Sequence, residues 1–134
     1  MDIKELKPTS IWHYFDAITG VPRPSKKEER IREFLLNFAK EQNLEVKVDK
    51  TGNVVITKEA TPGCEGAPTV ILQAHMDMVC EKNGDVKHDF ERDPIETYID
   101  GEWVKARGTT LGADNGIGMA AAAVDGCLYL AHLS

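Results

Sequence analysis

The stretch TVILQAHMDMVCEKN, residues 69–83, decides how the fold is interpreted. It begins with an apolar, β-rich run at residues 69–72, which is typical of a strand covered on both faces. His75 and Asp77 follow at the end of that run. Polar groups in such a position must be paired, hydrogen-bonded or bound to a metal, because burying them alone is costly. The stretch therefore predicts a buried strand that ends in a polar site.

Signals of an α/β protein surround this strand. The predicted helices cover residues 10–19, residues 25–42 and the segment from residue 115 onward. Gly20 ends the first helix, and Ser25 with Glu28 forms a capping box at the start of the second. The predicted strands cover residues 44–48, 54–57 and 69–72 and the two arms of a tight hairpin around residues 99–103. No internal repeat or long linker divides the chain.

Composition narrows the class of protein. A chain of 134 residues has the length of one domain, and 42% hydrophobic with 28% charged residues is ordinary for a soluble protein. The net charge of −6 argues against nucleic acid or an anionic membrane as the main partner. The longest apolar stretch, residues 117–133, is interrupted and too short to span a bilayer, and the charged start differs from a signal peptide. Three cysteines without a CxxC pair favour a reducing cytoplasm.

His75 and Asp77 are two residues apart, so on a strand their side chains point to the same side. A metal-bound imidazole usually donates its second N–H to a carboxylate, which fixes the tautomer. The spacing suits His75 as a metal ligand and Asp77 as its orienting partner. It suits equally a strand-end histidine that forms a salt bridge with a neighbour.

A second group of chemically useful residues lies in RGTTLGADNGIGMAAAA, residues 107–123. Asp114 stands at the entry of a helix of small residues, where an N-cap carboxylate is expected in any case. The loop is much richer in glycine than a cap requires, which indicates a further role. Gly116, Gly118 and Ala121 match the dinucleotide pattern G-x-G-x-x-A. No strand directly precedes them, so nucleotide binding is not expected.

Together these stretches resemble the aminoacyl-histidine dipeptidases, also called cytosol non-specific dipeptidases, within the two-metal aminopeptidases, carboxypeptidases and deacylases. The similarity is carried by IWHYFDAITGVPRPSKKEERIREFL, TGNVVI, VILQAHMDMVCEKN, DPI and DGEWVKARGTTLGADNGIGMAAA. It implies a three-layer αβα zinc-peptidase catalytic domain, here incomplete. By resemblance, His75 binds one metal, Asp77 has the catalytic role of orienting it, and Asp114 bridges two metals and precedes a cis peptide bond to Asn115.

The resemblance also implies the chemistry. Two zinc ions per complete site, or cobalt or manganese in their place, would activate a water that hydrolyses dipeptides, Xaa-His among them. The long match favours this activity over that of a deacylase or carboxypeptidase of the same architecture. A non-catalytic module that binds metal or a partner chain is the third alternative. Relatives of full length are expected to be cytoplasmic homodimers; neither nucleic acid nor a membrane is expected as a partner.

The similarity covers residues 8–123, within a catalytic part that we assign to residues 1–124. Residues 125–134 form a divergent tail, and His132 within it is given no ligand role. The family's general base, a glutamate in a Glu-Glu pair after the alanine-rich helix, has no counterpart here. Nor do its remaining ligands and its second, lid and dimerisation, domain. The chain is therefore expected to be a truncated and inactive fragment that binds zinc weakly and associates through exposed sheet.

Overall fold

The structure is a computed structural model that describes residues 1–124 and the backbone of residues 128–131. Its helices are η1 (Ile3–Glu5), α1 (Thr9–Thr19), α2 (Glu29–Glu41) and α3 (Ala113–Val124). Its strands are β1 (Glu45–Val48), β2 (Val54–Thr57), β3 (Gln73–His75), β4 (Thr97–Asp100), β5 (Trp103–Ala106) and β6 (Leu128–Ala131). None of the helices in these ranges is long and apolar enough to cross a membrane.

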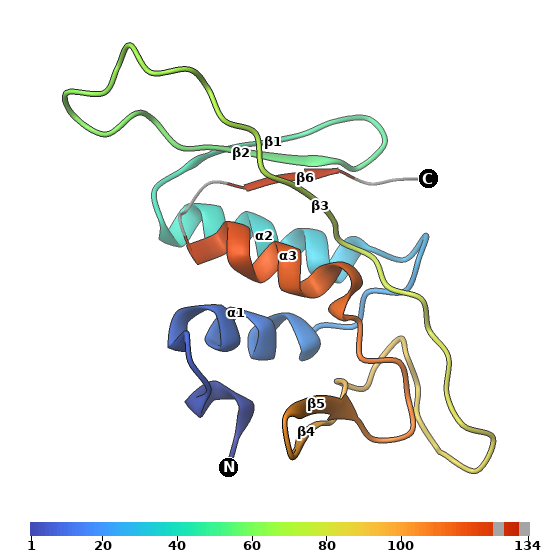
Figure 1. The fold of residues 1–134 in the computed structure, drawn as a ribbon. Helices are drawn as coiled ribbons and strands as arrows, with labels where there is room; N and C mark the ends of the chain where they lie inside the picture. The colour runs from blue at the N-terminus through green and yellow to red at the C-terminus, as the bar shows by residue number, and fades with distance from the viewer. Residues whose placement is uncertain (125–127, 132–134) are drawn as a thin grey trace.

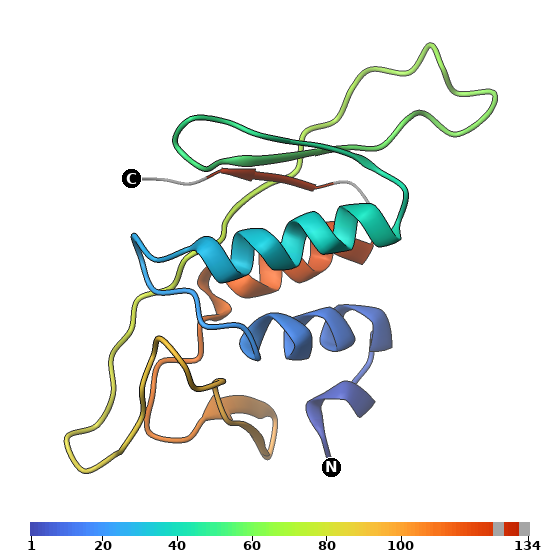
Figure 2. The same ribbon diagram turned by 180° about the vertical axis from the view of Figure 1, so that it is seen from behind.

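Four strands form the main sheet, in the order β1-β2-β6-β3. The first three pair antiparallel, whereas β6 and β3 are parallel. Figures 1 and 2 show α2 and α3 on one face of this sheet, with α1 packed on the far side of α3. The opposite face carries no helix in the described part of the chain. The α/β class is confirmed, with one helical layer on the sheet.

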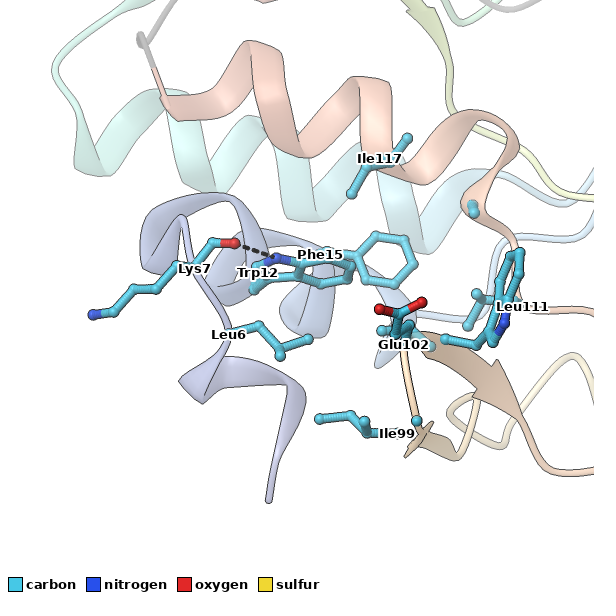
Figure 3. A pocket seen from close by; sticks show the side chains of 12 residues that line it. Leu6, Lys7, Trp12, Phe15, Ile99, Glu102, Leu111 and Ile117 are labelled. Carbon is cyan, nitrogen blue, oxygen red and sulfur yellow. Dashed lines mark hydrogen bonds between the residues drawn. The ribbon is translucent and has the colours of Figure 1, made fainter.

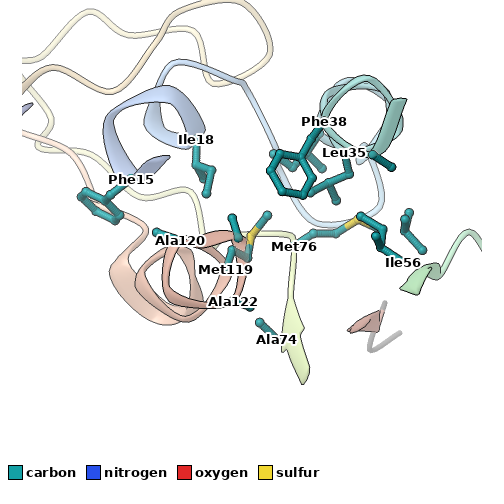
Figure 4. Packing of buried hydrophobic residues seen from close by; sticks show 14 of the residues in the cluster. Phe15, Ile18, Leu35, Phe38, Ile56, Ala74, Met76, Met119, Ala120 and Ala122 are labelled. Carbon is teal, nitrogen blue, oxygen red and sulfur yellow. The ribbon is translucent and has the colours of Figure 1, made fainter. Parts of the chain in front are cut away.

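Small side chains set how closely α3 approaches the sheet. Ala120, Ala122 and Ala123 are buried on this helix. Figure 4 shows Ala122 toward the buried Ala74 of β3, and Ala120 on the side of α1, next to Ile18. Figure 4 shows Met76 reaching from the end of β3 toward Leu35 and Phe38 of α2. Because Met76 is fully buried, the chain that follows β3 is fixed to the core at the point where the polar residues begin.

The apolar run at residues 69–72 is not a buried strand, so that prediction is wrong. Val70 and Ile71 are 74% and 69% exposed, and β3 begins only at Gln73. The physical reason is position: β3 lies at an edge of the sheet, and no described element covers the residues before it. Apolar content indicated burial, but burial also requires a covering layer.

Local signals elsewhere were reliable. Helix α1 ends at Gly20 as predicted, and α2 ends at Glu41. The β1–β2 hairpin pairs Val48 with Val54, and the β4–β5 hairpin turns at Gly101, whose φ is +61°. Helix α3 occupies the alanine-rich segment. The ends and turns of these elements are determined by residues that are close to them in the sequence.

The capping box predicted for α2 is wrong. Helix α2 begins after Glu28, whose side chain accepts the backbone N–H of Lys26 at 2.8 Å rather than capping the helix. Ser25 lies outside the helix and makes a different bond, described below. The S-x-x-E pattern is therefore present without the geometry that usually accompanies it.

The segment assigned to a divergent tail contributes to the sheet. Residues Leu128–Ala131 form β6, which lies between β2 and β3. Residues 125–127 and 132–134 lie outside the described residues, and His132 is one of them. The tail thus supplies a strand that the sequence did not lead us to expect.

Candidate metal centre

Side chains alternate between the core and the site along β3 and the residues that follow it. Ala74, Met76 and Met78 are buried on one side, while His75 and Asp77 are half-buried on the other. The imidazole Nδ1 of His75 lies 3.0 Å from Oδ1 of Asp77 and 3.0 Å from the backbone oxygen of Asp77. The two residues therefore meet as their spacing predicts, with one ring nitrogen directed at the carboxylate.

The second ring nitrogen faces Asp114. His75 Nε2 lies 3.0 Å from Oδ1 of Asp114, although 39 residues separate the two in sequence. The Asp114 side chain is 98% exposed, so its second oxygen is open to a ligand. Sequence reasoning nominated all three residues of this group, and the fold brings all three together.

The protonation of His75 decides what this contact means. If Nδ1–H donates to Asp77 in the neutral ring, Nε2 presents a lone pair to a carboxylate oxygen, and two acceptors face each other. A second proton on the imidazole, or a cation beside Nε2, removes that repulsion. The group is thus built to hold a positive charge between His75 and Asp114.

Ser25 is a member of the group that sequence reasoning assigned elsewhere. Its hydroxyl donates to Oδ2 of Asp77 at 2.5 Å, so both oxygens of that carboxylate are engaged. This contact orients Asp77, which in turn orients His75. The only sequence signal was a serine close to a helix start, and that signal was interpreted as a cap.

Asp114 does not cap α3, although its position at the helix entry suggested that it would. Both Asp114 and Asn115 have non-helical backbone angles, and Oδ1 of Asn115 accepts the backbone N–H of Gly118 at 3.1 Å. A Cβ at Gly118 would lie 2.2 Å from Oδ1 of Asn115, so a side chain there would displace the Asn115 side chain from this bond. The peptide bond Asp114–Asn115 is cis, as predicted. Asn115 caps the helix, and the Asp114 carboxylate remains available.

The electrostatics of the metal-free site favour a cation. Burial lowers the pKa of His75, but the hydrogen bonds to Asp114 and Asp77 outweigh burial and raise it above its ordinary value. Burial also acts against the charged form of Asp77. The hydrogen bond from Ser25 and the pairing with His75 outweigh that effect, so the pKa of Asp77 lies below its ordinary value. An imidazolium between two carboxylates is the expected state without metal.

The donor set fits part of a zinc site. Imidazole nitrogen and carboxylate oxygen are zinc ligands, and His75 Nε2 and Asp114 are available for that purpose. Among the described residues, no group of three or more His, Cys, Asp or Glu is arranged to hold a metal ion. His88 does not add a donor: it packs against the Phe90 ring at 4.5 Å between centroids. The described residues thus offer two donors and one orienting carboxylate.

A separate apolar pocket of about 400 Å³ lies between α1, the β4–β5 hairpin and the start of α3 (Figure 3). Trp12, Phe15 and Ile117 line it, and Trp12 Nε1 donates to the Lys7 carbonyl at 3.3 Å. Ala113 lines it too, but none of the three site residues does. The candidate centre is therefore an open edge beside the pocket and not part of its wall.

The fold is that of α/β peptidases. A tripeptidase from Staphylococcus aureus matches with a TM-score of 0.70 at 21% identity, over 88% of this chain and 31% of that structure, and shows the shared fold. An aminopeptidase from Bacillus cereus matches with a TM-score of 0.70 at 25% identity, over 85% and 30% respectively. The expected class, an incomplete α/β domain of this type, is confirmed. No protein-family model matches the chain.

Two further relatives narrow the resemblance to dipeptidases. The chain is 54% identical over 121 residues to the cytosol non-specific dipeptidase of Escherichia coli K12, covering 90% of this chain and 25% of the relative. The aminoacylhistidine dipeptidase of Vibrio alginolyticus matches at 55% identity with a TM-score of 0.89, over 92% of this chain and 26% of that one. The chain is similar to these dipeptidases, as its sequence predicted, and spans about a quarter of their length.

Proposed function

We propose that this chain carries part of the metal site of a dipeptidase. His75 Nε2 and the Asp114 carboxylate hold a zinc ion, and Asp77 orients His75. When bound, zinc supplies Lewis-acid polarisation of a peptide carbonyl and of water. The observation that carries the proposal is the contact of 3.0 Å between His75 Nε2 and Asp114 Oδ1, with Nδ1 already held by Asp77.

The reaction class is supported by the relatives. Two proteins above 50% identity over most of this chain are named dipeptidases. In a complete site two zinc ions, or cobalt or manganese in their place, would act on dipeptides, with Asp114 shared between the ions. The E. coli relative is named a cytosol enzyme, which supports a cytoplasmic location for this protein too.

We further propose that the 134 residues alone bind metal without turnover. A catalytic zinc usually takes three protein ligands and keeps one position for water. His75 and Asp114 supply two, and one of those is to be shared. The glutamate base that the resemblance implies has no counterpart in the sequence, and positioned proton transfer typically contributes about 10² to 10⁴-fold. The missing ligand and the missing base would both impair the attack of water on the peptide carbonyl.

Calorimetric titration of the purified chain with zinc and cobalt tests metal binding. We expect weak, chelator-reversible binding that His75→Ala abolishes. Binding that His75→Ala leaves unchanged would show that the ion sits elsewhere and that His75 is only an ion-paired imidazolium. His13→Ala, an exposed histidine on α1, is the matched control and is expected to bind like the parent.

An activity assay tests the second part. The chain is incubated with Xaa-His and other dipeptides in the presence of zinc, cobalt or manganese, and released amino acids are quantified. We expect rates at background. Metal-dependent turnover that disappears in His75→Ala would refute the proposal of inactivity while supporting the metal site.

A further inference from the structure

Arg23 is the buried charge closest to the candidate centre. Its side chain is 1% exposed, and it lies in the loop between α1 and α2. Burying an arginine without partners is costly, so its contacts must compensate. Those contacts are all backbone oxygens. Nη1 donates to the carbonyls of Met76 and Asp77 at 3.2 and 3.1 Å, and Nη2 donates to the carbonyl of Gly112 at 2.6 Å.

These three carbonyls belong to the two segments that carry the metal donors. Met76 and Asp77 directly follow His75, and Gly112 precedes Asp114 by two residues. Farther from His75, Thr110 also joins these segments, since its hydroxyl donates to the Val79 carbonyl at 2.7 Å and its N–H to the Glu81 carbonyl at 2.9 Å. Between those bonds and the site, the two segments are connected by Arg23. One guanidinium therefore ties the strand-end segment to the helix-entry segment, next to where His75 and Asp114 meet.

The surroundings are shaped for this side chain. Gly112 has a φ of +79°, and a Cβ built there would lie 2.6 Å from Nη2 of Arg23. The backbone of Arg23 is also fixed. Its carbonyl accepts the N–H of Met78 at 3.0 Å, and the next residue, Pro24, forms an isolated parallel β-bridge with Met78. The Arg23 Nε–H has no partner among the described residues. The guanidinium is therefore held by the hydrogen bonds of its two terminal nitrogens, Nη1 and Nη2. The planar guanidinium places Nη1 at one segment and Nη2 at the other, which the single ammonium group of lysine could not do.

We propose that Arg23 is a positioning residue for the metal site: its guanidinium bridges the His75 and Asp114 segments and keeps their side chains at a separation that one ion can span. The inference rests on the proposed function. Arg23 itself touches neither donor side chain and contacts no substrate. Its charge persists at neutral pH, because burial lowers its pKa only to about 10 while Asp77 and Cys80 act against that decrease.

The chain offers a matched control. Arg32 on α2 is half-buried, and its Nε donates to the carbonyl of Gly52 at 3.0 Å in the β1–β2 turn. It is thus another arginine bonded to a glycine carbonyl, but remote from His75 and Asp114. Arg32→Lys and Arg32→Met reproduce the loss of such a bond without touching the site.

The experiment compares Arg23→Lys, Arg23→Met and the two Arg32 variants by cobalt affinity, urea unfolding and backbone amide hydrogen exchange. Lysine keeps the charge but lacks the two-armed geometry. We expect Arg23→Lys to remain folded, to bind cobalt about 10 to 100-fold more weakly, and to exchange the Gly116 amide faster. That amide donates to the Gly112 carbonyl at 3.0 Å and reports on the bridge without metal. Arg32 variants should keep parental affinity.

Each outcome decides between the two proposals. Cobalt affinity within twofold of the parent in folded Arg23→Lys overturns the inference, as does an equal loss in Arg32→Lys. Should Arg23→Met fail to fold, Arg23→Lys alone decides. A parent that binds no metal refutes the proposed function, and the Gly116 exchange rate then still tests the bridge: unchanged exchange in Arg23→Lys overturns it.

Discussion

Asp49 and Asp114 both lie near glycine and asparagine residues, but their carboxylates differ in how they are hydrogen-bonded. Asp49, in the turn between β1 and β2, accepts the backbone N–H groups of Thr51, Gly52 and Asn53 at 2.9 Å each, and its second oxygen accepts Nδ2 of Asn53 at 2.6 Å. Asp114, at the entry of α3, accepts no backbone N–H that the structure records, because Asn115 occupies the capping role.

The difference lies in where the asparagine stands. Asn53 follows Asp49 by four residues and donates to it, so that the carboxylate is saturated within its own turn. Asn115 follows Asp114 directly and takes its place as cap, so that the carboxylate is left for a distant histidine. A saturated carboxylate stabilises local structure, whereas an unsaturated one can bind a ligand. Substitutions at the two sites should therefore affect different properties.

The largest effect is expected for Asp114→Ala, which should reduce zinc and cobalt affinity below detection. The unfolding midpoint in urea should change little, because the side chain is 98% exposed and caps nothing. Calorimetry and urea titration measure the two properties. Retained affinity would contradict the assignment of Asp114 as a donor.

Asn115→Ala is the counterpart on the same segment. It removes the bond to the Gly118 N–H and should lower the free energy of unfolding by about 1 kcal/mol, as for other lost N-caps. The urea unfolding curve reports this change. An unchanged curve would mean that Asn115 does not stabilise the helix and that the comparison with Asp49 is wrong.

A smaller loss of affinity is expected for Asp77→Ala. The variant frees His75 Nδ1 but keeps both donors, so zinc affinity should fall by about 10 to 100-fold, as is typical when an orienting carboxylate is removed. Calorimetry on folded protein measures it. Complete loss of binding would place Asp77 on the metal itself, and parental affinity would remove it from the site.

For Asp49 the expected effect is on stability and its pH dependence. Hydrogen bonds, chiefly from Asn53, lower the pKa of Asp49 to about 2. Because the folded pKa is depressed, the stabilisation is present above the unfolded value near pH 4 and is lost as pH falls through about 2. Asp49→Asn should be less stable than the parent at pH 5, and the gap should close toward pH 2. A constant gap in urea midpoints would exclude this explanation. Metal affinity at neutral pH should not change.

The smallest effect is expected for His88→Ala, a histidine in neither region. Its ring contacts Phe90 and its Nε2 is buried without a partner among the described residues, so it contributes packing but no donor. Zinc affinity should equal that of the parent in the same calorimetric titration. A loss above tenfold would bring the polar segment at residues 81–94 into the site.

Sequence reasoning succeeded where the deciding residues are neighbours. Gly20 and Gly101 end or turn their elements locally, and the H-x-D spacing placed His75 and Asp77 on one side. It failed where the partner is distant. Ser25 satisfies a capping pattern with Glu28, yet its partner Asp77 is 52 residues away.

The remaining errors have the same origin. The apolar residues 69–72 are exposed because covering them depends on other elements, which no local pattern reports. Arg23 carries no signal in sequence, since one arginine among many charged residues reveals neither its burial nor its three carbonyl partners. His75, Asp77 and Asp114 could be nominated, but their convergence could not be derived without the fold.

The position of β6 has a consequence for biosynthesis. This strand is inserted between β2 and β3, so β3 gains its parallel neighbour only after residues 128–131 have been translated. On the ribosome, the strand that presents His75 must wait for more than fifty later residues before it is held in a sheet. Pairings this distant in sequence form slowly, and exposed strand edges invite association in the meantime. Gln73–His75 thus form the part of the nascent chain whose strand edge has no β6 partner until residues 128–131 have been made.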